Sequence, residues 1–226
     1  MRTPRLVATD VDGTLLGADE DPSERTCRVL GRMSEAGVPL VLATGRPPRW
    51  LPRVCAAVDV QGLCVTANGA VLYDAATDRV LDAVTVSGDD LVEVIAGLRE
   101  ALPGCGLAVE RIGRSAHDAV DEQFVSESAY RHAWPNPDDR RVEPGELAEK
   151  PVVKVLARHP GMDSDAMAAA ARARLDGLVD VTWSASSGTW LTRWRAALLA
   201  MKSTSTISAT LPLPRIVAPA TLSIWR

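Results

Sequence analysis

Two aspartates follow a short apolar segment near the start of the chain, and their types and spacing suit metal and phosphate chemistry. The apolar run 6–8 precedes Asp10, Asp12, Gly13 and Thr14. An apolar run that ends in acids and a glycine predicts a buried strand that delivers carboxylates to a sheet edge. Because Asp10 and Asp12 are two positions apart, both would point to the same side of a continuing strand. Their oxygens suit magnesium, which takes one or two carboxylates together with substrate phosphate.

A second apolar run, 38–43, ends in Thr44, Gly45 and Arg46. A hydroxyl, a bare backbone and a guanidinium supply the neutral donors and the bidentate cation that phosphate oxygens accept. In open α/β sheets, ligands bind beyond the carboxyl ends of the strands. The two strand ends are therefore predicted to form one site for a phosphorylated ligand.

The elements that must position these residues alternate between strand and helix. Strands are predicted at 5–10, 38–43 and 63–66, with helices at 22–36 and 47–58 between them. The first helix has Asp21 as its predicted N-cap and Gly37 just past its end. This alternation predicts a parallel sheet with crossover helices. Asn68-Gly69 then predicts a turn, and 70–73 with 79–84 predict a hairpin.

A smaller α/β pattern follows from about residue 82. Helices are predicted at 89–102 and 163–175, the second capped by Asp163 or Ser164, and strands at 107–109, 151–157 and 179–183. Residues 111–150 are polar and rich in turn signals, so they are predicted to be loops. Lys150 and Lys154 are interpreted as a solvated strand edge, with contact to substrate as the alternative.

Three stretches together resemble the haloacid dehalogenase-like (HAD) phosphatases: residues 10–15, 43–46 and 67–70. The Cof-type branch, subfamily IIB-like, with a large α/β cap, is the most similar. The resemblance implies the α/β class, with a Rossmann-like parallel sheet core and an inserted α/β cap. It divides the chain into a first part of the core at 1–82, a cap at 83–185, and an atypical, incomplete return to the core at 186–226.

The same resemblance implies hydrolysis of a phosphate monoester of a sugar or other small metabolite. Asp10 would be the nucleophile that forms an aspartyl-phosphate, and Asp12 the general acid and base. Thr44, Gly45 and Arg46 would bind the phosphate, and Asp10 and Asp12 would hold Mg²⁺. Two alternatives stay open: a catalytically impaired phosphate-binding or regulatory member of the family, and a phosphotransferase (mutase).

The composition of the chain limits which classes of partner are expected. Residues 1–180 hold 20 basic and 29 acidic residues, a balance of 20 − 29 = −9, which would repel a polyanion, so nucleic acid is not an expected partner. No apolar run approaches the roughly 20 residues of a membrane span, and no export signal is read, so we expect a cytoplasmic protein without a membrane partner. The four cysteines are then expected to be reduced thiols. The sequence predicts neither the identity of the substrate nor the oligomeric state.

The last part of the chain departs from the family. After Asp180 there is no Asp or Glu, whereas the family takes acids for its metal site from its final core segment. Lys202 falls near the position of the family's phosphate-site lysine, but its surroundings lack the expected loop and helix. We expect an altered C-terminus or a degenerate family member, with weak magnesium binding and poor turnover. Strand 5–10 would be a sheet edge unless 215–218 pairs with it.

Overall fold

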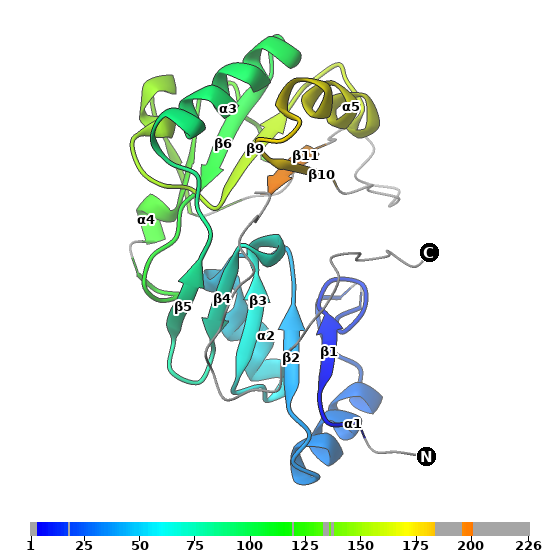
Figure 1. The fold of residues 1–226 in the computed structure, drawn as a ribbon. Helices are drawn as coiled ribbons and strands as arrows, with labels where there is room; N and C mark the ends of the chain where they lie inside the picture. Colours follow the sequence, from blue (N-terminus) through cyan, green and yellow to red (C-terminus); the bar gives the residue numbers. More distant parts are fainter. Residues whose placement is uncertain are drawn as a thin grey trace.

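The structure is a computed structural model that describes residues 4–17, 19–118, 120–132, 136, 138–183 and 196–200. Two sheets lie one above the other, each with helices packed beside it (Figure 1). The first sheet has the strand order β1-β2-β3-β4-β5, and the second has the order β10-β11-β9-β6-β7-β8. The elements of the first unit are β1 (Val7–Asp10), α1 (Glu24–Glu35), β2 (Leu40–Ala43), η1 (Pro48–Trp50), α2 (Leu51–Val58), β3 (Leu63–Thr66), η2 (Ala67–Gly69), β4 (Val71–Asp74) and β5 (Arg79–Ala83).

The first sheet is parallel from β1 to β3 and antiparallel from β3 to β5. The predicted α/β class is confirmed, but the sheet is mixed rather than wholly parallel. The reason lies in η2, which joins β3 to β4 in one tight turn. Asn68 and Gly69 have φ angles of 61° and 96° there. So short a link returns the chain antiparallel, because a parallel pair needs a crossover of a dozen or more residues.

Helix α1 begins at Glu24, two residues later than predicted. The N-cap is Ser23, whose hydroxyl accepts a hydrogen bond from the Thr26 N–H at 3.1 Å, so the prediction of Asp21 is wrong. Gly37 follows the helix with a φ of 67°, as its place after the last turn predicts. No residue of α1 is fully buried, and Leu30 is one of its partly buried contacts with the first core.

The second unit contains more regular structure than the sequence predicts. Its elements are α3 (Gly88–Ala101), β6 (Gly106–Glu110), α4 (Val120–Gln123), β7 (Phe124–Ser126), β8 (Asp139–Arg141), η3 (Pro144–Ala148), β9 (Lys154–Arg158), α5 (Ser164–Leu175), β10 (Asp180–Trp183) and β11 (Ala196–Ala200). Strands β7 and β8 lie inside the polar stretch that was predicted to be loops. They are only three residues long, which is too short to show an alternating pattern. Asp163 caps α5, as predicted.

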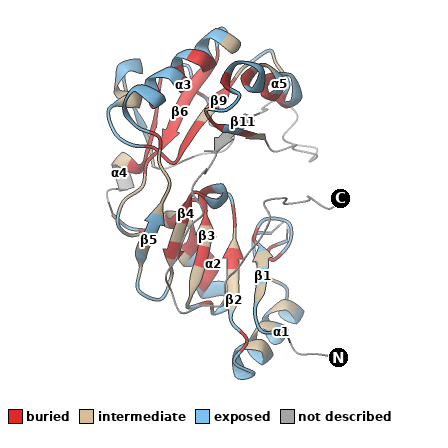
Figure 2. Ribbon diagram, in the orientation of Figure 1, coloured by how far each residue is buried: buried red, intermediate tan, exposed pale blue. Residues whose placement is uncertain are grey.

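Buried residues lie along the central strands of both sheets and on helices packed against them (Figure 2). In the second unit α3 and α5 contribute Leu91, Leu98 and Met167, which pack against the sheet. The core of the first unit also includes Ala116 and Val153, which come from the second unit's part of the chain. The two units therefore share apolar contacts. Among the described helices, none is both long enough and apolar enough to cross a membrane.

Strand β11 joins the second sheet, where it lies antiparallel between β9 and β10. Residues 196–200 therefore do not return to the first sheet, as a core segment at 186–226 would require. Among the described strands, β1 lies at the end of the first sheet. Both 215–218, predicted to pair with β1, and Lys202 lie outside the described residues. The boundaries at 82 and 185 stay predictions.

Candidate functional site

Asp10 is the last residue of β1, and its side chain is exposed at the end of the strand that faces the second unit (Figure 1). The strand does not continue to Asp12, because the chain folds back at Gly13, whose φ is 76°. The Gly13 N–H donates to the Leu16 carbonyl at 3.1 Å, which closes this turn. Thr14 Oγ1 donates to Asp10 Oδ2 at 3.2 Å and so orients the first carboxylate.

The end of β2 lies directly beside the end of β1, because the parallel register pairs Asp10 with Ala43. Thr44 Oγ1 donates a long hydrogen bond of 3.4 Å to Asp12 Oδ2. Arg46 contacts both oxygens of Asp12, with Nη2 at 2.6 Å from Oδ1 and Nε at 3.2 Å from Oδ2. The hydrogen bond with Asp12 raises the pKa of Arg46 above its ordinary value. The structure thus places Asp10, Asp12, Thr44 and Arg46 together, and their catalytic and binding roles stay predictions.

Asn68 is a neighbour of the site, and the sequence indicates it as part of a turn and of the family-like stretch 67–70 without giving it a role. Its N–H donates to the Thr44 carbonyl at 3.1 Å, and its side chain lies beside Gly45. A Cβ placed on Gly45 would lie 3.3 Å from Asn68 Oδ1, so the glycine permits this close approach. The Asn-Gly pair after the third predicted strand was the sequence signal that could have indicated this position.

A group of charged residues joins η1 of the first unit to the second unit. The Arg49 guanidinium contacts both Glu110 oxygens at the end of β6, and its Nε lies 2.6 Å from Asp138 Oδ2. The side chains of Arg49 and Glu110 are only 3% and 6% exposed. Trp50 Nε1 also donates to Asp138 Oδ2, at 3.2 Å. Nothing in the sequence pattern linked these residues, which are far apart along the chain.

Lys154 lies in the same region, at the start of β9 opposite Glu110 in the antiparallel register. It is 6% exposed, and its Nζ donates to the Gly45 carbonyl oxygen at 2.6 Å. The prediction that Lys154 is solvated is therefore wrong, whereas Lys150 is exposed and pairs with Glu122. Burial lowers the pKa of Lys154 to about 8, although the negative charge of Glu110 opposes this shift.

Asp10 and Asp12 are the residues predicted from the sequence to hold a metal ion. Both residues are exposed and offer hard oxygen ligands, which fit Mg²⁺ with water and substrate phosphate completing its shell. Within the described residues, no group of three or more His, Cys, Asp or Glu side chains converges as a metal site. A metal here would share Asp12 with Arg46.

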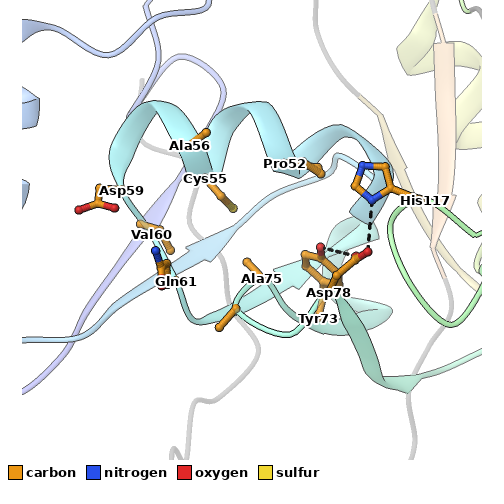
Figure 3. A pocket seen from close by; sticks show the side chains of 11 residues that line it. Pro52, Cys55, Ala56, Asp59, Val60, Gln61, Tyr73, Ala75, Asp78 and His117 are labelled. Carbon is orange, nitrogen blue, oxygen red and sulfur yellow. Dashed lines mark hydrogen bonds and ion pairs between the residues drawn. The ribbon is translucent and has the colours of Figure 1, made fainter.

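A separate cavity of about 370 Å³ is lined by α2, the β4–β5 hairpin and His117 (Figure 3). Asp78 on its rim accepts hydrogen bonds from Tyr73 Oη at 2.8 Å and from the Ala116 N–H at 2.8 Å, and it contacts His117. Burial opposes ionisation of Asp78, but these hydrogen bonds hold its pKa below the ordinary value. Because Ala116 and His117 belong to the second unit's chain segment, this cluster ties that segment to the hairpin.

The match to known proteins covers most of the chain. A family model described as haloacid dehalogenase-like hydrolase matches residues 7–192. The chain belongs to this family. Among its solved relatives, a haloacid dehalogenase-like hydrolase from Bacteroides thetaiotaomicron has a TM-score of 0.64 at 18% identity, over 89% of this chain and 72% of the other. A subclass IIB sugar phosphatase has a TM-score of 0.62 at 16% identity, over 88% and 71%. At these identities the likeness shows the fold.

A curated relative matches part of this haloacid dehalogenase-like hydrolase. The HMP-PP phosphatase of Shigella flexneri is 33% identical over 94 residues, which are 42% of this chain and 32% of the relative. The match therefore spans about a third of the length of that relative.

Proposed function

We propose that this protein hydrolyses phosphate monoesters of small metabolites through an aspartyl-phosphate on Asp10. The observation that carries the proposal is the convergence of two strand ends. An exposed carboxylate held by Thr14 lies at the end of β1, and the Thr44–Arg46 loop lies beside it at the end of β2. Membership of a hydrolase family and the partial match to a phosphatase support the same reaction.

In the proposed reaction, the Asp10 carboxylate attacks phosphorus and the bond to the ester oxygen breaks. Asp12 protonates the departing alcohol, and it later takes a proton from the water that attacks the aspartyl-phosphate. Inorganic phosphate leaves and Asp10 is restored. Thr44 Oγ1 and the N–H of Gly45 would bind phosphoryl oxygens, with Arg46 as the nearby cation. Magnesium, held by the Asp10 carboxylate and the Asp12 carbonyl, would neutralise phosphate charge.

Phosphate binding without turnover is the second candidate, and one contact favours it. Arg46 contacts both oxygens of Asp12, so the guanidinium occupies the carboxylate that the general acid would have to present to the leaving alcohol. The chain also has no acid after Asp180. In this case the loop would bind a phosphorylated ligand and leave the ester intact.

Replacement of Asp10 by Asn tests the proposal. With p-nitrophenyl phosphate, a panel of sugar phosphates and a diphosphate ester, the parent chain should release phosphate in the presence of Mg²⁺. Asp10→Asn keeps the side-chain shape but removes the nucleophile, so turnover should fall by about 10³-fold or more. Asp59→Asn is the matched control, because Asp59 is an exposed residue after α2 and outside the site.

Three outcomes separate the alternatives. Release of phosphate that depends on Asp10 supports the hydrolase. An isomerised sugar phosphate without release indicates a mutase. Saturable binding of the ligand with neither product indicates the impaired phosphate-binding protein, and turnover that survives in Asp10→Asn contradicts the proposed mechanism.

A further inference from the structure

We propose that Lys154 is a positioning residue for this reaction: by holding the Gly45–Arg46 peptide from the second unit, it fixes the orientation of Thr44 and Asp12. The inference rests on the proposed function and adds a residue that no sequence motif indicated. Lys154 has no place in the bond-making steps above. Its effect passes through the backbone of the phosphate loop, defined here as residues 44–46.

The Gly45–Arg46 peptide links Lys154 to Asp12 by two routes. Its oxygen accepts a hydrogen bond from Lys154 Nζ at 2.6 Å, and its N–H donates to Thr44 Oγ1 at 3.1 Å. Thr44 Oγ1 in turn donates to Asp12 Oδ2 at 3.4 Å. The second route is the Arg46 side chain, which contacts both Asp12 oxygens. A rotation of this one peptide would therefore move both groups that orient Asp12.

The Gly45–Arg46 peptide is the part of the phosphate loop whose carbonyl is held by a contact from the second unit. Its flanking carbonyls are held within the first unit, because the Asn68 N–H donates to Thr44 O at 3.1 Å and the Ala67 N–H donates to Arg46 O at 2.9 Å. Gly45, between them, is exposed and has no side chain to restrict it. The contact that holds its carbonyl comes from Lys154, across the two units.

Lys154 itself is held firmly in place. Burying an ammonium group costs several kcal/mol unless its partners compensate, so its position is set by the groups around it. Glu110 lies opposite on β6 and attracts it, while Arg49 on η1 repels it. Asp138 completes the charged group through its contact with Arg49. A buried lysine among these charges donates to one defined acceptor rather than sampling the solvent.

Loss of this contact should lower the rate of the chemical step more than substrate binding. Lys154→Met removes the donor and keeps a long apolar chain that suits the buried position. We expect kcat for p-nitrophenyl phosphate to fall by about 10- to 100-fold, the cost typical of misplaced catalytic groups. KM should rise by a smaller factor than kcat falls, because the phosphate-binding groups are shifted but not removed. Lys150→Met is the matched control, since Lys150 is exposed and lies in the same unit.

The pH profile separates positioning from a general loss of stability. Because the pKa of Lys154 lies at about 8, its ammonium loses a proton as the pH rises through that value and the hydrogen bond to Gly45 weakens. In the parent and in Lys150→Met, kcat should decrease as the pH rises through this range. The folded Lys154→Met variant should show no such decrease. The inference is overturned if the kcat of Lys154→Met equals that of the parent, or if its pH profile shows the same decrease.

Amide exchange of Arg46 supplies a readout that needs neither turnover nor a variant. In the parent chain, the protection factor of this N–H should fall between pH 7 and pH 9 as Lys154 is deprotonated, whereas that of Val60, whose N–H bonds to Cys55 O, should stay constant. A constant protection factor for Arg46 overturns the inference even if the enzyme is active. If no phosphate ester is turned over, the proposed function fails, and the exchange result still decides whether Lys154 holds the loop.

Discussion

The charged group that joins the two units offers a sharp test of what holds them together. Replacing Arg49 with Met removes the guanidinium and keeps an unbranched side chain of similar reach. Glu110 and Asp138 would then both lose their buried cationic partner, and their side chains are only 6% and 12% exposed. Lys154, opposite Glu110, would still offer that carboxylate a positive charge.

The expected loss of folding stability follows from the free-energy cost of leaving a buried charge unpaired. Removing one partner of a buried ion pair destabilises a protein by about 3–5 kcal/mol. We expect about 3 kcal/mol, because Lys154 still faces Glu110 and because Glu110 can take up a proton. Burial already raises the pKa of Glu110, against the opposing effect of Arg49, and loss of the arginine raises it further. The loss of stability of the variant relative to the parent chain should therefore be smaller near pH 5 than at pH 7.

Urea unfolding followed by circular dichroism measures this loss. With an m-value of about 3 kcal/mol/M, the midpoint should fall by about 1 M. Arg53→Met is the control, since the Arg53 side chain is 77% exposed and lies 4.0 Å from Asp21, and it should cost less than about 0.5 kcal/mol. The double variant Arg49→Met with Glu110→Gln should recover about 1–2 kcal/mol of folding stability, because it removes one unpaired buried charge. A loss below about 1 kcal/mol, or no recovery in the double variant, would refute this reasoning.

Two further predictions concern packing and the metal. Gly106→Ala should destabilise the second unit by about 3 kcal/mol, because the new Cβ would lie 2.3 Å from the backbone nitrogen of Tyr130. Gly145→Ala meets no atom within 4 Å and should be close to neutral in the same urea experiment; equal losses would contradict the packing argument. Arg46→Met should tighten Mg²⁺ binding about fivefold or more, since it removes a cation worth about 1 kcal/mol at contact distance. Calorimetric titration in the absence of substrate checks this, and unchanged affinity would show that the charge of Arg46 does not act on the metal site.

Most of the local structure and the residues of the site could be predicted from the sequence alone. Strand β3 has its predicted bounds of 63–66, and Asp163 caps α5. These features depend on neighbouring residues, where apolar runs and capping side chains carry the signal. The acids and the phosphate loop were predicted to meet because both follow strands of one sheet. The register of β1 and β2 does place them side by side.

The way in which the second unit contacts that site could be seen only in the folded protein. Arg49 is 61 residues from Glu110, and Lys154 is 109 residues from Gly45. No local pattern encodes such contacts, because a charged side chain in a sequence is normally read as solvated. Whether Lys154 lies in solvent or in a buried charged group depends on the β6–β9 register and on the unit packed below it. The same holds for β11, whose place in the second sheet is seen only from its pairing with β9 and β10.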